Sequence, residues 1–212
     1  MLQYTTVIPT TLELLKKLMQ LSSLQDFYLV GGTALALQTG QRISIDLDLF
    51  TEHDFDTHIV LNELKLFFNI TDIVNKNNSL NLYIEYPKQS NDFVKIDILK
   101  YPYPLISNIL VTEKIRMLCV EDIIPMKLSA ITNTGAKKDF YDIYFLFEHY
   151  TLKQMLDLFD RKYPSTNHFQ LLKSLTYFDN AETDVNPQTI KKISWKQVKN
   201  KIEKTVKNYL NA

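Results

Sequence analysis

Apolar and alternating runs in the first half of the chain have the two-residue period that predicts β-strands. These runs are residues 27–30, 43–50, 70–75, 80–86 and 93–99. Asn77 and Asn78 separate the third run from the fourth and predict a hairpin turn. In residues 43–50 the aliphatic side chains share one face, so Asp46 and Asp48 point together from the other face.

Apolar residues at helical spacing predict amphipathic helices over residues 10–24 and 54–68. Thr10 and Glu13 have the spacing of a capping box. Residues 111–120 predict one more strand, after which the pattern becomes almost wholly helical. We therefore expect an α+β protein with a mixed sheet flanked by helices, followed by a C-terminal helical region. The expected domains are residues 1–115 and 116–212, with the active site in the cleft between them.

Composition narrows the class of protein without naming a partner. The 212 residues are 45% hydrophobic and balance 24 Lys+Arg against 24 Asp+Glu, so a nucleic-acid contact would need a local basic patch. Residues 191–212 hold seven lysines and one glutamate, which fits either a solvated helix or an RNA-backbone contact. Cys119 is the single cysteine, and the sequence shows no cleavable signal or membrane-length apolar run. We expect a cytoplasmic protein without a membrane partner.

The first candidate site combines a glycine turn with two neighbouring carboxylates. Gly31 and Gly32 follow the strand at 27–30, and Thr33 opens a short helix whose N-terminus suits phosphate. Two carboxylates about 4 Å apart repel by about 4 kcal/mol at an effective dielectric of 20, and Mg²⁺ removes that penalty. The order of these elements favours nucleotide chemistry. The alternative for Asp46 and Asp48 is the solvated face of a strand.

The segments GGTALAL and DLDLF resemble the signature of the nucleotidyltransferase superfamily, in particular the AbiEii/AbiGii-type toxin family. The resemblance implies that Gly31, Gly32 and Thr33 hold the triphosphate of a nucleotide. It also implies that Asp46, Asp48 and a carboxylate on a later strand hold two Mg²⁺ ions. Asp97 interrupts the apolar run 93–99, so it fits as that third ligand.

The same resemblance implies the reaction and its partners. The protein would transfer a nucleoside monophosphate from a nucleoside triphosphate to an acceptor hydroxyl, such as an RNA or tRNA 3′ end. A toxin role in abortive infection, restrained by a cognate antitoxin, would follow. The rival hypotheses are a catalytically inactive nucleotide-binding module of the same fold and a protein-interaction module whose carboxylates are surface residues.

A second candidate site lies in the segment KLSAITNTGAKKDFYD. Lys127 stands in an apolar helix, where its ammonium needs water or an anion. Asp139 and Asp142 are three residues apart on one helix face, which by itself predicts a solvated helix start.

The family resemblance gives this segment a part in the reaction. It implies that Lys127 neutralises triphosphate charge and that Lys138 contacts phosphate or base. Asp139 and Asp142 would support the site or help deprotonate the acceptor. Thr134 stands near the position where many members carry arginine, which puts full activity in question.

Overall fold

The computed structural model describes residues 2–164 and 167–211, which form two compact units. Unit 1 comprises the chain up to Pro104 together with Asn108–Cys119, and unit 2 comprises Leu105–Ser107 and the chain from Val120 onward. Unit 1 therefore extends to Cys119, past residue 115, where we predicted the first domain to end.

Unit 1 is built on a seven-stranded sheet with the order β3-β4-β5-β2-β1-β7-β6. Strands β2 and β5 pair in parallel, as do β1 and β7, and the other neighbours pair antiparallel. The expected mixed sheet is confirmed. The strands are β1 (Tyr28–Val30), β2 (Leu47–Thr51), β3 (Asn69–Lys76), β4 (Ser79–Glu85), β5 (Phe93–Lys100), β6 (Leu110–Thr112) and β7 (Ile115–Met117).

Two hairpins show how turn residues set the strand boundaries. Strands β3 and β4 are joined through Asn77 and Asn78, and Asn78 has a φ of 55°, which confirms the predicted hairpin. The single strand predicted over residues 111–120 is wrong. Glu113 and Lys114 have φ values of 50° and 67°, so the chain reverses there and forms the β6–β7 hairpin.

Strand β2 is shorter than the predicted run 43–50, because residues before Leu47 leave the sheet. Ser44 pairs instead with Val7 near the N-terminus, and its N–H donates to the carbonyl of Thr6 at 2.9 Å. Ile45 is 54% exposed, although the alternation placed it on the buried face. Asp46 thus lies just ahead of the strand and Asp48 lies within it.

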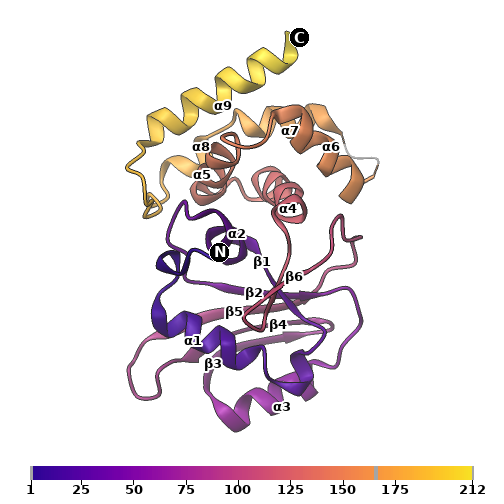
Figure 1. The fold of residues 1–212 in the computed structure, drawn as a ribbon, viewed down its shortest axis with the longest axis vertical. Helices are drawn as coiled ribbons and strands as arrows, with labels where there is room; N and C mark the ends of the chain where they lie inside the picture. The colour runs from indigo at the N-terminus through magenta and orange to yellow at the C-terminus, as the bar shows by residue number, and fades with distance from the viewer. Residues whose placement is uncertain (1, 165–166, 212) are drawn as a thin grey trace. The chain divides into compact units, whose positions relative to one another are not determined.

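The helices of unit 1 are α1 (Pro9–Leu18), α2 (Gly31–Thr39) and α3 (Thr57–Phe67), with short 3₁₀ turns at Tyr4–Thr6 and Ser22–Leu24. Helix α2 contacts β1 and β2, and α3 contacts β3 and β4 (Figure 1). The N-terminal segment runs beside α2, where the N–H of Gln3 donates to the carbonyl of Leu37 at 2.7 Å (Figure 1).

The two helices predicted over residues 10–24 and 54–68 differ from the structure at their ends. Helix α1 ends at Leu18, and Ser22–Leu24 forms a separate 3₁₀ turn. Helix α1 begins at Pro9, whose fixed φ and missing N–H suit a first helical position, and no capping box forms. Glu13 accepts a hydrogen bond from the Tyr86 hydroxyl at 2.5 Å instead. Helix α3 begins at Thr57 because the carboxylate of Asp56 caps it, accepting from the N–H of His58 at 2.8 Å.

Unit 2 is helical, as predicted, with α4 (Val120–Asn133), α5 (Lys137–Leu146), α6 (Leu152–Lys162), α7 (His168–Leu175), α8 (Asp179–Glu182) and α9 (Trp195–Leu210). The long C-terminal helix α9 packs on α5, α6 and α7 (Figure 1). Asp122 holds the detached segment Leu105–Ser107 to this unit by accepting the N–H groups of Ile106 and Ser107 at 2.9 and 2.8 Å. Among the residues described, every helix is too short or too polar to span a lipid bilayer.

Candidate functional site

The glycine turn between β1 and α2 lies directly against Asp48. Gly31 has a φ of +67°, and a Cβ at this position would collide with the carboxylate of Asp48. A Cβ on Gly32 would come within 2.5 Å of Nη2 of Arg42. Each glycine therefore lies against a different charged side chain, and only Gly31 also has a backbone conformation that L side chains rarely adopt. The first N–H groups of a helix lack intrahelical acceptors, so the turn places Asp48 beside an anion-binding helix end.

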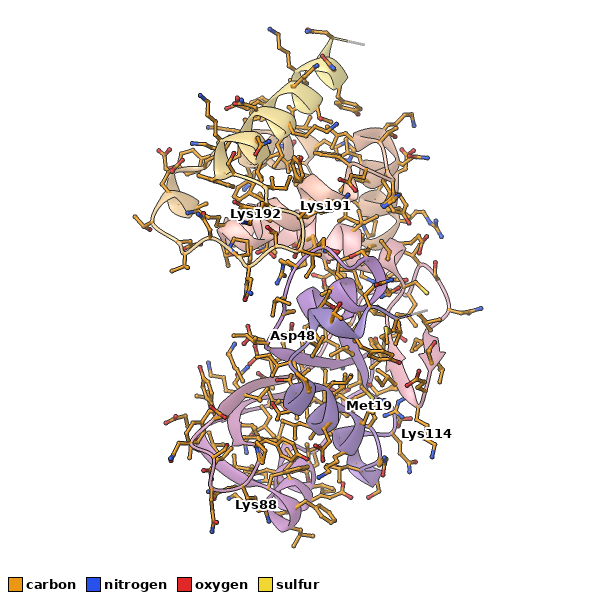
Figure 2. All side chains as sticks on the ribbon, turned by 60° about the vertical axis from the view of Figure 1, so that its left-hand side comes forward. Met19, Asp48, Lys88, Lys114, Lys191 and Lys192 are labelled. Carbon is orange, nitrogen blue, oxygen red and sulfur yellow. The ribbon has the colours of Figure 1, made fainter. Side chains whose placement is uncertain are left out.

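Asp48 and Asp97 lie side by side on adjacent parallel strands. They are register partners in the β2–β5 pairing, and neighbouring strands lie about 4.8 Å apart. Asp46 precedes β2 by one residue. We call Asp46, Asp48 and Asp97 the acidic cluster. Figure 2 shows Asp48 next to α2, in agreement with its contact at Gly31.

Lys95 supplies positive charge to the acidic cluster. It lies two residues before Asp97 on the same face of β5, and its Nζ is 2.6 Å from Oδ2 of Asp97. Burial by itself would lower the pKa of Lys95, but the bond to Asp97 and the attraction of Asp97, Asp46 and Asp48 raise it. A lysine ammonium thus sits in the field of all three carboxylates.

Asn81 fixes the orientation of Asp97 from the opposite side. It is the register partner of Asp97 on β4, and its side-chain amide donates to Oδ1 of Asp97 at 2.8 Å. Asp97 therefore has one oxygen bonded to a neutral amide and the other bonded to an ammonium. Strand pairing places Asn81 beside Asp97, and Lys95 lies on the same strand as Asp97. No loop has to fold over the site to supply these two donors.

Thr33 acts on the loop that carries Asp46. Its hydroxyl donates to the backbone carbonyl of Asp46 and lies 2.9 Å from Oγ of Ser44, and its side chain is fully buried. The side chain is therefore committed to holding this loop. A phosphate contact from Thr33 would come from its backbone N–H at the start of α2.

Sequence reasoning missed Arg42, Lys95 and Asn81. Arg42 is 4% exposed, and its guanidinium donates to the carbonyl of Ile43 at 3.1 Å beside Gly32. The signal for Lys95 was present, because residues 95 and 97 share a face of an alternating strand. Asn81 carried no such signal, since only the strand pairing brings it to Asp97.

The chemistry of the acidic cluster fits a divalent cation, with one qualification from its geometry. Carboxylate oxygens are the ligands that Mg²⁺ prefers. All three aspartates of the acidic cluster already attract a cation, the Lys95 ammonium. Within residues 2–164 and 167–211 no group of three or more His, Cys, Asp or Glu side chains is arranged to hold a metal ion. The three carboxylates are of the type that binds Mg²⁺. In this structure they are arranged with the Lys95 ammonium bonded to Asp97.

The second candidate site is a buried ion cluster within unit 2. Nζ of Lys127 is 2.8 Å from Oδ1 of Asp139 and 2.8 Å from Oδ2 of Asp142, and we call these three residues the lysine cluster. The exposed fractions of the side chains are 8%, 7% and 0%, respectively. The predicted solvated helix start at Asp139 and Asp142 is therefore wrong. Helix α5 packs against α4, and both carboxylates face Lys127.

Lys138 lies beside this cluster in sequence but differs from it in environment. Lys138 is exposed, whereas the preceding Lys137 is buried and donates to the carbonyl of Glu182 at 3.3 Å. Thr134 is exposed and donates its hydroxyl to the carbonyl of Ala130 at 2.9 Å. The structure thus brings Lys127, Asp139 and Asp142 together and leaves Lys138 at the surface.

The lysine-rich C-terminal segment forms an amphipathic helix. Helix α9 buries Val198, Ile202 and Val206, which confirms the helix. Lys191 and Lys192 lie on the loop ahead of it (Figure 2), and Lys191 is 3.4 Å from Glu148. An RNA contact by this segment stays a prediction.

Comparison with known proteins identifies relatives of this chain over nearly its whole length. Residues 13–210 match the family described as nucleotidyl transferase AbiEii toxin, type IV toxin–antitoxin system. The uncharacterized protein aq_aa25 of Aquifex aeolicus (strain VF5) is 32% identical over 207 residues, which cover 93% of this chain and 95% of the relative.

Two solved structures share the fold at low sequence identity. MenT4, a nucleotidyltransferase toxin of Mycobacterium tuberculosis H37Rv, gives a TM-score of 0.63 at 15% identity, covering 96% of this chain and 83% of MenT4. JHP933 of Helicobacter pylori gives a TM-score of 0.57 at 19% identity, covering 95% and 92% of the two chains. These likenesses show that the nucleotidyltransferase-like fold is shared.

Proposed function

Since this chain belongs to the AbiEii family of nucleotidyl transferase toxins, we propose that it transfers a nucleoside monophosphate from a nucleoside triphosphate to an acceptor hydroxyl. The observation that carries the proposal is the position of Asp48, which contacts Gly31 at the start of α2 and pairs with Asp97 on β5. Anion-binding backbone and cation-binding carboxylates therefore meet at one side chain, as a metal–triphosphate substrate requires.

The parts of the site in unit 1 divide the work. The turn at Gly31 and Gly32, together with the N-terminus of α2, would bind the β- and γ-phosphates. Thr33 would hold the Asp46 loop in place through its buried hydroxyl. Asp46, Asp48 and Asp97 would hold Mg²⁺, expected as two ions with the bound nucleotide. The metal would supply neutralisation of phosphate charge and a more acidic acceptor hydroxyl.

Membership of the family leads us to propose roles for charged groups of unit 2 as well. Asp139 and Asp142 hold the ammonium of Lys127 in one place. From the family resemblance we propose that Lys127 neutralises triphosphate charge and that the two carboxylates support the site. The exposed Lys138 would contact phosphate or base. The acceptor proposed is an RNA or tRNA 3′ end, with the lysines of residues 191–207 as a local basic patch. A cognate antitoxin is the partner that membership of a toxin–antitoxin family implies.

The test is incubation of purified protein with Mg²⁺, each α-labelled nucleoside triphosphate in turn and total RNA. We expect label in a discrete RNA band, and no label with the Asp46→Asn/Asp48→Asn double variant. Asp92→Asn, which makes the same chemical change at an exposed position of unit 1, serves as the matched control and should transfer normally.

The outcome separates the proposed reaction from its rivals. Transfer by a folded double variant would exclude the proposed site. Binding of nucleotide and Mg²⁺ without labelling of any acceptor would favour the inactive nucleotide-binding module. Absence of nucleotide binding would favour an interaction module.

A further inference from the structure

The acidic cluster of unit 1 carries a cation of its own, the ammonium of Lys95. We infer that this ammonium is an exchangeable counter-ion of Asp46, Asp48 and Asp97, which a divalent metal has to displace before it can bind. The inference rests on the proposed function, because it concerns the same carboxylates. It assigns Lys95 a role in setting the metal affinity of the site.

The geometry places Lys95 in competition with a metal. Nζ of Lys95 lies 2.6 Å from Oδ2 of Asp97, so it occupies the oxygen that a metal ligand would have to offer. Asp48 is the register partner of Asp97 and also attracts the ammonium, so a metal shared by these two carboxylates would meet the positive charge of Lys95. Two cations do not share one carboxylate oxygen at contact distance without strong repulsion.

The charge of the cluster explains why Lys95 stays there. Three carboxylates close together repel one another, and the ammonium of Lys95 offsets part of that repulsion. Electrostatic attraction from Asp46, Asp48 and Asp97 raises the pKa of Lys95 against the effect of burial. The metal-free cluster is therefore stabilised by a tethered cation, and the metal gains only the difference between its own attraction and that of the lysine.

Exposure allows the exchange. The Lys95 side chain is 40% exposed, so its ammonium can move into water without leaving a buried charge behind. Asp97 keeps its orientation when this happens, because Asn81 continues to donate to its other oxygen at 2.8 Å. The ammonium of Lys95 can therefore leave while Asp97 stays in position to bind a metal.

The experiment measures binding of Mn²⁺ alone, without nucleotide, by isothermal titration calorimetry at low ionic strength. Lys95→Gln should bind Mn²⁺ at least about fivefold more tightly than the parent protein, since the competing charge is gone. Lys95→Arg keeps the charge and should not gain affinity. Lys88→Gln removes a lysine from an exposed position of the same unit and should leave the affinity unchanged (Lys88 is labelled in Figure 2).

A second readout tests the electrostatic origin of the gain. The ratio of affinities between Lys95→Gln and the parent protein should shrink as salt is raised toward about 1 M, where the screening length falls to about 3 Å. Adding Asp48→Asn to Lys95→Gln should reduce Mn²⁺ binding and thereby locate the site. Circular dichroism of each variant checks that it is folded.

The outcomes distinguish the two proposals. Equal Mn²⁺ affinity for the parent protein, Lys95→Gln and Lys88→Gln overturns the exchange and leaves the transferase proposal standing. Weaker binding by Lys95→Gln also overturns it, because the lysine would then support the metal. If neither protein binds Mn²⁺ at a site sensitive to Asp48→Asn, the exchange fails together with the metal site.

Discussion

The acidic cluster of unit 1 and the lysine cluster of unit 2 use the same chemistry in opposite environments. Lys95 is bonded to Asp97 at 2.6 Å, and Lys127 is bonded to Asp139 and Asp142 at 2.8 Å. Lys95 is 40% exposed, whereas Lys127 is 8% exposed. Each of the aspartates that hold Lys127 is less exposed than Asp97, at 7% and 0% against 17%.

The difference decides what each cluster can do. Removing one partner of a buried ion pair leaves an uncompensated charge and costs about 3–5 kcal/mol, whereas an exposed pair is worth about 0–1 kcal/mol. Lys95 can therefore give way to another cation, and Lys127 is held. An ion cluster that is open to solvent can exchange its charges, and a buried one keeps them in position.

The largest expected effect is a loss of catalysis when the acidic cluster is changed. Asp48→Asn should lower the rate of nucleotidyl transfer about a thousandfold, because metal-assisted charge stabilisation is worth several kcal/mol. Its free energy of unfolding should change by less than about 0.5 kcal/mol, since the substitution also relieves carboxylate repulsion. Labelled-nucleotide transfer and urea denaturation measure the two quantities. A destabilisation similar to that of a core variant would mean that Asp48 is structural.

Substitution in the lysine cluster should change the free energy of unfolding. Lys127→Met should lower the free energy of unfolding by about 3–5 kcal/mol, because Asp139 and Asp142 remain buried without their cation. Lys95→Met, the same substitution beside the acidic cluster, should lower the free energy of unfolding by less than about 1 kcal/mol. Urea unfolding of both variants checks the contrast. Equal losses in the two variants would remove the distinction between the clusters.

The glycine turn sharpens the comparison from the backbone side. Gly31→Ala should destabilise by more than about 2 kcal/mol, because it adds a Cβ at a φ of +67° and into the Asp48 carboxylate. Gly40→Ala is the matched control, with a φ of +75° but only the flexible side chain of Gln3 near the new Cβ. It should cost about 1–2 kcal/mol. Equal costs, measured by thermal unfolding, would show that the carboxylate of Asp48 moves aside freely.

The last prediction concerns a carboxylate held by uncharged donors. Glu63 accepts the N–H groups of Ser22 and Ser23 at 3.1 and 2.7 Å. Burial would raise its pKa, but the hydrogen bonds from Ser22 and Ser23 lower the pKa from 4.5 to about 2. Because the folded pKa is depressed, the stabilisation is complete above pH 4.5 and is lost as the pH falls toward about 2.

Glu63→Gln provides the measurement. The difference in unfolding free energy between the parent protein and this variant should be constant above pH 4.5 and shrink below it. A difference that stays constant down to pH about 2 would show that these donors do not favour the charged carboxylate.

Local sequence patterns predicted most of the secondary structure. They failed where segments that are distant in the sequence pack together. The alternation of residues 93–99 placed Lys95 and Asp97 on one face of β5, which the structure confirms. The same rule failed at residues 43–46, because Ser44 pairs with Val7 and draws that segment out of the sheet. The helical pattern likewise placed Asp139 and Asp142 in solvent, since the sequence does not show that α5 packs on α4.

The sequence by itself determined the family, the mixed sheet with its helical continuation, and the spacing of Gly31, Gly32, Asp46 and Asp48. These are local properties, set by residue type and by periods of two or about four residues. The family resemblance already grouped Asp97 with Asp46 and Asp48. Tertiary structure alone decided that Lys95 lies in the field of the acidic cluster and that Lys127 is buried. The physical reason is that strand register and burial depend on which distant segments pack together, and the charges of a site are set by the neighbours that packing supplies.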